Sequence, residues 1–181
     1  MGSERDLCAD AVLARATDDV LRGGEILEDL PDPDAVLIPW GGGGLTTGIA
    51  SAIKAQRPEV KIYAVEPETA APLNATLEAG SPQEVEYTPS FVDGAGGRAL
   101  MPKMWALAEP LLDGAYTASL DETAAAVRML AERARVIAEG AGALAPAVAL
   151  SGKVEGKVVC IVSGGNIDFS VLNVILAGRT P

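Results

Sequence analysis

Four consecutive glycines, Gly41, Gly42, Gly43 and Gly44, constrain the fold of this chain more than any other feature. They follow a short apolar run at residues 35–39 and precede residues 45–56, where apolar side chains recur at helical spacing. A second apolar run occupies residues 61–65. Strand, glycine loop, helix and strand within about thirty residues form a βαβ unit, whose strands are parallel and whose crossover is right-handed.

The rest of the chain continues this alternation of strand-like and helix-like segments. Further strands are predicted at residues 115–118 and 157–162. Helices are predicted at residues 24–30, 100–108 and 168–177. A capping box of Ser119 and Glu122 predicts a helix that runs toward Arg133. A separate alanine-rich helix is predicted after Gly142 and ends at about Leu150. The stretch 66–98, which contains four prolines, is predicted to be rich in loops, with no helix singled out.

The predicted core is aliphatic, because 49% of the residues are apolar and only 4% are aromatic. This balance is typical of parallel sheets that are covered on both faces. We therefore expect residues 1–181 to form a single α/β domain, a three-layer open parallel sheet with helices on both faces.

The glycine run is a candidate anion site. Residues without Cβ let successive backbone N–H groups converge, and the dipole of the following helix adds positive potential. The dinucleotide fingerprint fails, because its third glycine would fall at Thr46 or Thr47, and the P-loop fails because Ile49 stands where lysine is needed. Glu66 after the second strand could imitate a ribose-binding carboxylate, so a nucleotide ligand stays open.

A second glycine turn, Ser163-Gly164-Gly165-Asn166, also follows a predicted strand directly. Ligands of open parallel sheets bind outside the carboxyl ends of the strands. We therefore expect both turns at one edge, where the first offers N–H groups to a phosphate and Ser163 offers a hydroxyl to a second part of the ligand.

Several classes of function are excluded by composition. The chain has no histidine, which removes the Ser-His-Asp triad, Cys-His proteases and zinc sites that need imidazole. A net charge of −11 disfavours nucleic acid and anionic membrane surfaces as partners. Residues 1–10 lack the apolar core of a signal peptide, and no stretch reaches the roughly 18 apolar residues of a membrane span, so we expect a cytoplasmic protein.

Five motifs occur together and in order: residues 36–45, 64–67, 92–94, 139–142 and 162–166. Their sequences and spacing resemble the serine/threonine dehydratases of fold type II, which depend on pyridoxal phosphate (PLP), and their relative serine racemase. The resemblance covers roughly residues 22–177.

The resemblance implies a role for each matching residue. The PLP phosphate would be held by the backbone N–H groups of Gly41, Gly42, Gly43, Gly44 and Leu45. Ser163 would hydrogen-bond the pyridine nitrogen, and Gly94 and Glu139 would lie beside the cofactor ring.

Glu66 and the carbonyl of Ala70 match a divalent-cation site found in some members of the family. The carboxylate expected two residues after Ala70 is replaced by Pro72, so this site lacks one of its ligands.

The chain also departs from the family, because it contains neither a Ser-Phe-Lys-type segment with the Schiff-base lysine nor the asparagine loop over the cofactor. We therefore interpret it as the PLP-phosphate-binding portion of a dehydratase whose amino-terminal, lysine-bearing half is absent. The lysines present do not substitute: Lys61, Lys157 and Lys153 are expected at the far edge of the sheet, and Lys54 lies late in a helix. Position alone does not exclude Lys103, and no catalytic residue is assigned.

The activity that the resemblance implies is β-elimination of water from a small hydroxy amino acid, serine or threonine, to give a 2-oxo acid and ammonia. We expect the chain to be inactive alone, as a fragment, as one of two complementing chains, or as a non-catalytic relative. Loss of the covering half would expose apolar surface, so we expect a homo-oligomer or a complementing chain. The alternative from another class is a non-catalytic nucleotide- or phosphometabolite-binding module.

Overall fold

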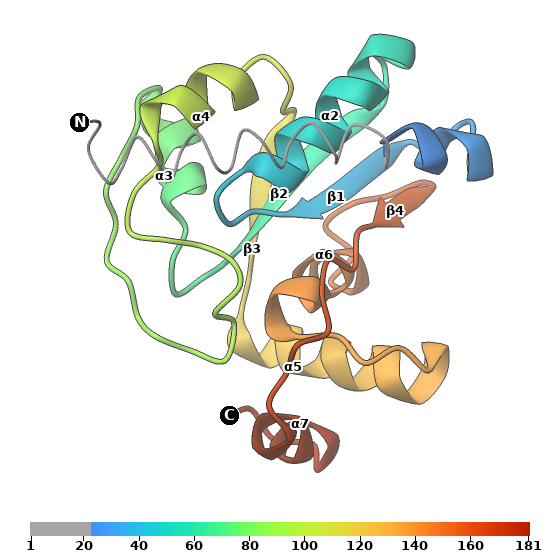
Figure 1. Cartoon of the computed structure of the whole chain (residues 1–181), viewed down its shortest axis with the longest axis vertical. Coiled ribbons are helices and arrows are strands. Elements are labelled where there is room, and N and C mark those ends of the chain that lie inside the picture. The colour runs from blue at the N-terminus through green and yellow to red at the C-terminus, as the bar shows by residue number, and fades with distance from the viewer. Residues whose placement is uncertain (1–22) are drawn as a thin grey trace.

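The computed structural model describes residues 23–181 and places four parallel strands in one sheet (Figure 1). The strand order is β3-β2-β1-β4, and every neighbouring pair is parallel. The strands are β1 (Ala35–Pro39), β2 (Lys61–Pro67), β3 (Gly114–Ala118) and β4 (Val158–Cys160). All four carboxyl ends therefore lie at one edge of the sheet. Residues 1–10, which were considered above as a possible signal peptide, lie outside the described part of the chain.

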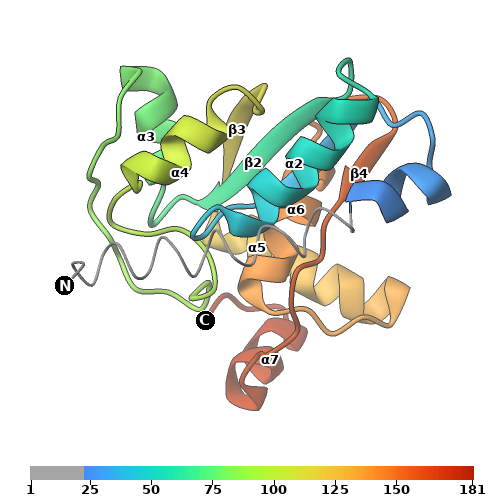
Figure 2. The same cartoon turned by 45° about the horizontal axis from the view of Figure 1, so that its top comes forward.

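Helices cover both faces of the sheet, as Figure 2 shows. One face carries α2 (Gly44–Gln56), α3 (Pro72–Ala79) and α4 (Pro102–Ala108). On the other face α6 (Gly140–Leu150) lies against the strands, and α5 (Leu120–Met129) and α7 (Phe169–Leu176) pack outside it. A short helix at residues 23–29 precedes β1. The predicted three-layer α/β architecture is confirmed.

The core is divided by the alternation of side chains along the strands. In β1, Leu37 packs with the α5–α6 layer, whereas Val36 and Ile38 pack with α2, and all three are fully buried. This double burial explains why β1 is a continuous apolar run rather than an alternating one. The central strand therefore holds the glycine loop that follows it in a fixed position.

Helix α3 was not predicted, because the prolines of residues 66–98 were interpreted as loop signals. Pro72 is tolerated because it stands in the first turn of α3, where its missing N–H would have no helical acceptor. Gly80 ends the helix in the left-handed conformation, with φ of 69°. The prediction for this part of the stretch was therefore wrong.

The remaining elements agree with the predictions apart from their lengths. The capping box is confirmed: the Glu122 backbone N–H donates to Ser119 Oγ, and the Ser119 N–H donates to the Glu122 carboxylate. After α5 the chain continues as a π-helix, Leu130–Ala134, that ends at Arg135 with φ of 60°. Strand β4 is shorter than predicted, since it pairs only with residues 35–37 of β1. None of the helices between residues 23 and 181 combines the length and apolarity that a bilayer crossing needs.

Candidate ligand site at the carboxyl edge of the sheet

The glycine loop joins β1 to α2 in a conformation that excludes a Cβ atom. Gly43 has φ of 89°, a left-handed backbone that favours glycine. A Cβ on Gly43 would lie 2.7 Å from the ring of Trp40, which is fully buried beneath the loop. The loop therefore keeps its path only while residue 43 is glycine.

The start of α2 presents free N–H groups. The first helical N–H groups, those of Gly44, Leu45 and Thr46, have no intrahelical acceptor, and no side chain caps this helix. Within residues 23–181 these three groups donate to no acceptor. Because α2 is 13 residues long, its dipole adds positive potential at the same place. These donors suit a phosphate or sulfate group.

Two threonines that were not singled out in the sequence hold the loop. Thr46 Oγ1 donates to the carbonyl of Pro39 at 3.1 Å, and Thr47 Oγ1 donates to the carbonyl of Gly43 at 2.9 Å. Both side chains are buried. Thr46 ties the helix start to the end of β1, and Thr47 ties it to the glycine loop, so the free N–H groups are held in place. The only sequence signal was a hydroxyl residue pair directly after the glycines.

Segments distant in sequence meet beside the glycine loop. A Cβ on Gly41 would lie 3.0 Å from the Gly94 carbonyl oxygen, and a Cβ on Gly94 would lie 3.1 Å from Glu139 Oε1. The Glu139 N–H donates to the Gly164 carbonyl at 3.1 Å. The structure therefore brings Gly41, Gly94, Glu139 and the second glycine turn together at one edge. The topology predicted this common edge for the two glycine turns, and the resemblance implied a place there for Gly94 and Glu139.

Glu139 stabilises the second glycine turn. Its Oε2 accepts the Asn166 backbone N–H at 3.0 Å, and a Cβ on Gly164 would lie 2.5 Å from its Oε1. The neighbouring Ser163 is exposed, and its hydroxyl makes no hydrogen bond within the described part of the chain. The Ser163 hydroxyl can therefore serve a ligand. The roles assigned to Leu45, which is half-buried, and to the other candidates stay predictions.

Glu66 has a structural role that the sequence did not reveal. Its fully buried carboxylate caps α3 by accepting the backbone N–H groups of Leu73 and Asn74, at 3.0 and 2.9 Å, and the Asn74 side-chain amide at 2.8 Å. Burial raises the pKa of Glu66 to about 7, although the donors from Asn74 and Leu73 oppose this shift.

The structure adds no cluster of carboxylates to the predicted cation ligands, Glu66 and the carbonyl of Ala70, within residues 23–181. Among residues 23–181 no three His, Cys, Asp or Glu side chains group as a metal site. The Ala70 carbonyl lies against Gly96, where a Cβ would come within 2.4 Å of its oxygen. The cation site stays a prediction.

The structure places four of the five lysines in contacts away from the glycine loop. Lys61 and Lys54 both pair with Asp113, at 2.8 and 2.7 Å, at the amino edge of the sheet. Lys157, directly before β4, pairs with Asp32. Lys103 is exposed in the first turn of α4.

The prediction for Lys153 was wrong. Its ammonium group donates to the carbonyl of Thr117, one residue before the end of β3, and pairs with Glu122 at 3.6 Å. Its ammonium group therefore lies toward the carboxyl end of β3 rather than at the amino edge of the sheet. It still lies at β3, two strands away from β1 and the glycine loop.

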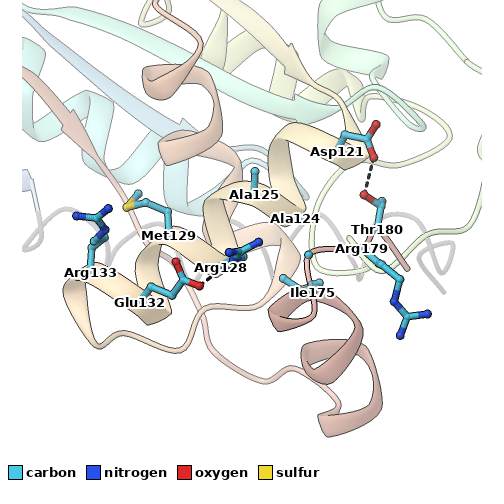
Figure 3. A pocket seen from close by; sticks show the side chains of 11 residues that line it. Asp121, Ala124, Ala125, Arg128, Met129, Glu132, Arg133, Ile175, Arg179 and Thr180 are labelled. Carbon is cyan, nitrogen blue, oxygen red and sulfur yellow. Dashed lines mark hydrogen bonds and ion pairs between the residues drawn. The ribbon is translucent and has the colours of Figure 1, made fainter.

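A pocket of about 470 Å³ lies elsewhere, between α5 and the carboxyl-terminal residues that follow α7 (Figure 3). Arg128 pairs there with Glu132 at 2.8 Å, while the side chains of Arg133 and Arg179 lie at opposite ends of the pocket. None of the residues predicted to bind a cofactor lines it. Its arginines do not converge on one point, so we place the candidate site at the glycine loops instead.

The start of α2 and the second glycine turn together offer hydrogen-bond donors for two different parts of one ligand. The N–H groups at the start of α2 fit a phosphate, and the free hydroxyl of Ser163 fits a hydrogen-bond acceptor in another part of the same ligand. These residues fit PLP, which carries a phosphate and a pyridine nitrogen at different positions of its ring.

Comparisons with known proteins point in the same direction. A family model described as "Pyridoxal-phosphate dependent enzyme" matches residues 22–164. L-threonine ammonia-lyase of Thermotoga maritima is 40% identical over 156 residues, which cover 85% of this chain and 39% of that protein. The processed form of threonine deaminase isoform 2 from Solanum lycopersicum has a TM-score of 0.80 at 33% identity, over 88% of this chain and 48% of its own.

Maize serine racemase is also similar, with a TM-score of 0.79 at 31% identity over 85% of this chain and 51% of its own. The chain therefore spans about half the length, or less, of the relatives that it matches.

The buried cap of α3 predicts a pH-dependent stability. Because the pKa of Glu66 is about 7 in the folded chain and about 4.3 in an unfolded one, the folded state binds more protons between these values. The free energy of unfolding should fall by about 3 kcal/mol as pH rises from 4.5 to 7, and Glu66→Gln should flatten this fall. Urea unfolding at several pH values measures it.

Glu78→Gln is the matched control, because Glu78 is exposed on the same helix. It should leave the pH profile unchanged. Parallel profiles for the wild type and Glu66→Gln would contradict the prediction, and would mean that the N–H donors of α3 keep Glu66 ionised.

Proposed function

This chain belongs to the family of pyridoxal-phosphate dependent enzymes, and from that premise we propose that it binds the phosphate of PLP at residues 41–45. The observation that carries the proposal is the set of free N–H groups at the start of α2, which the left-handed Gly43 and the buried Thr46 hold in place. The matched relatives are longer, so the activity of a whole enzyme is also a proposal.

The second glycine turn would orient the cofactor ring. Ser163 would donate its free hydroxyl to the pyridine nitrogen. A neutral hydroxyl does not favour a protonated ring, in contrast to a carboxylate. Gly94 and Glu139 would lie beside the ring, a placement that their contacts with Gly41 and with the second turn support.

The reaction that we propose for the whole enzyme is the elimination of water from serine or threonine, which yields a 2-oxo acid and ammonia. PLP supplies the electron sink for this chemistry, and the protein supplies orientation and proton transfer. This chain would contribute the orientation, through N–H groups that hold the phosphate and a hydroxyl that holds the ring. The proton at the substrate Cα needs a basic group such as a lysine amine, and we assign none here.

The lysine of the whole enzyme would therefore lie outside residues 1–181. Support comes from the lysines themselves, since Lys54, Lys61 and Lys157 are in ion pairs at or near the amino edge and Lys153 is engaged at β3. The alternative, a nucleotide-binding module, has no dinucleotide fingerprint in the loop and loses its ribose-binding candidate, because Glu66 is occupied in capping α3.

The first prediction from this proposal concerns the phosphate. Gly43→Val should lower the affinity for PLP at least about tenfold, because a β-branched side chain meets Trp40 and moves the N–H groups. Isothermal titration calorimetry measures it. Wild type should also prefer PLP over pyridoxal, which lacks the phosphate.

Gly80→Val is the matched control: Gly80 has a similar left-handed backbone, with φ of 69°, but nothing lies near its Cβ position. It should keep the affinity for PLP. Equal affinity of the wild type and Gly43→Val, or of wild type for PLP and pyridoxal, would refute the phosphate site. Tighter binding of NAD than of PLP would favour the nucleotide-binding alternative.

The second prediction concerns turnover. The chain alone should bind PLP reversibly and release no 2-oxo acid from serine or threonine, because Lys54, Lys61, Lys153 and Lys157 are engaged away from the glycine loop and no lysine is assigned to the reaction. Borohydride reduction with PLP, followed by peptide mapping and a keto-acid assay, tests this. Stoichiometric labelling of one lysine together with turnover would contradict it, and Lys103 is the first position to inspect.

A further inference from the structure

The pocket between α5 and the residues that follow α7 plays no part in the proposed cofactor site (Figure 3). Its volume of about 470 Å³ lies within the range of sites that bind small molecules. Its floor is apolar, because Ala124 of α5 and Ile175 of α7 are buried there and Met129 is half-buried. The pocket can therefore cover the hydrocarbon part of a small molecule.

The walls of this pocket are held together by hydrogen bonds within the chain. The N–H groups of Gly178 and Arg179 donate to carbonyls in the last turn of α7, at 2.9 and 3.1 Å. Because Gly178 is left-handed, with φ of 78°, these two hydrogen bonds form a Schellman motif, which fixes the direction of the chain after the helix. Thr180 Oγ1 then donates to the carboxylate of Asp121 in α5. The pocket is therefore preformed.

The carboxylates that line the pocket are already engaged. Asp121 accepts a hydroxyl, and Glu132 pairs with Arg128 at 2.8 Å. Within residues 23–181 the guanidinium groups of Arg133 and Arg179 have neither a hydrogen-bond acceptor nor an ion-pair partner. The charge that this pocket still offers to a ligand is therefore positive, although the whole chain carries −11.

The two unpaired guanidinium groups lie at opposite ends of the pocket, as Figure 3 shows. Arg133 stands in the π-helix that continues α5, a rare element that is frequent at functional sites, and Arg179 follows α7. A single small anion could pair with only one of them. A ligand with a carboxylate at each end could pair with both, because a guanidinium group binds a carboxylate through two parallel hydrogen bonds.

Other classes of ligand fit this pocket less well. A cation would meet the carboxylates of Asp121 and Glu132, which already accept a hydroxyl and a guanidinium group. A purely apolar molecule would make no use of the two unpaired arginines. A polyanion such as nucleic acid would be repelled by the net charge of −11.

We propose that the pocket between α5 and the residues after α7 binds a linear dicarboxylate. Its two carboxylates pair with Arg133 and Arg179, and its methylene groups lie over Ile175 and Met129. The pocket lies apart from the glycine loops, so this proposal does not rest on the proposed function. It gives the chain a second ligand site.

Isothermal titration calorimetry with succinate, adipate and suberate, which differ in the length of the hydrocarbon chain, tests this proposal. At least one of them should bind at least about tenfold more tightly than hexanoate, which has a single carboxylate. Amide chemical shifts of the ¹⁵N-labelled chain locate the site. On addition of the tightest of the three, the largest shifts should occur at residues 124–133 and 175–180.

Two variants test the bridging geometry. Arg133→Gln and Arg179→Gln should each lower the affinity for this dicarboxylate at least about tenfold. Each variant should bind it about as weakly as the wild type binds hexanoate, because one arginine remains. Arg57→Gln is the matched control, since Arg57 is an exposed arginine directly after α2 and outside the pocket. It should leave the affinity unchanged.

Failure of all three dicarboxylates to bind at millimolar concentrations would overturn the proposal. Equal affinity for the dicarboxylates and hexanoate, or an affinity that both Arg133→Gln and Arg179→Gln retain, would overturn it as well. Largest shifts at Gly44 and Leu45 would place the dicarboxylate at the start of α2 and would also contradict it. Both arginine variants should keep the affinity of the wild type for PLP, so a failure of this pocket and a failure of the cofactor site give different results.

Discussion

The uncapped start of α2 is the feature on which the site depends. Its N–H groups lack acceptors in the described structure, and a glycine loop without room for a Cβ at residue 43 keeps them accessible. The loop is held from both sides, by the buried Trp40 ring beneath it and by the Thr46 hydroxyl bonded to the end of β1. Because β1 is buried on both faces, these contacts place the donors rigidly at the centre of the sheet edge.

The site is assembled by close backbone approaches rather than by a cluster of charged side chains. Gly41 lies close to the Gly94 carbonyl, and Gly94 lies close to the Glu139 carboxylate. Gly164 lies close both to that carboxylate and to Gly142 in the first turn of α6. Each approach leaves little or no room for a Cβ atom. Segments separated by more than a hundred residues thus meet at the carboxyl ends of β1 and β4, which is where open parallel sheets bind ligands.

Much of this could be predicted from the sequence, because periodicity and the glycine turns are local signals. The βαβ unit, the capping box of α5 and the common edge of the two glycine turns all appear as expected. Helix α3 was missed because its proline stands in the first turn, and the role of Glu66 was missed because it depends on that helix. The contact of Lys153 with the Thr117 carbonyl joins residues 36 positions apart, and no local pattern records such a contact.

The central claim is that the start of α2 binds the phosphate of PLP. Titration of the ¹⁵N-labelled chain with PLP, followed by amide chemical shifts, tests it most directly. The account predicts that the largest shifts occur at the backbone N–H groups of Gly44, Leu45 and Thr46, whose donors are free. Unchanged shifts there, with large changes around Arg128 and Arg179 in the pocket between α5 and the carboxyl-terminal residues, would contradict it.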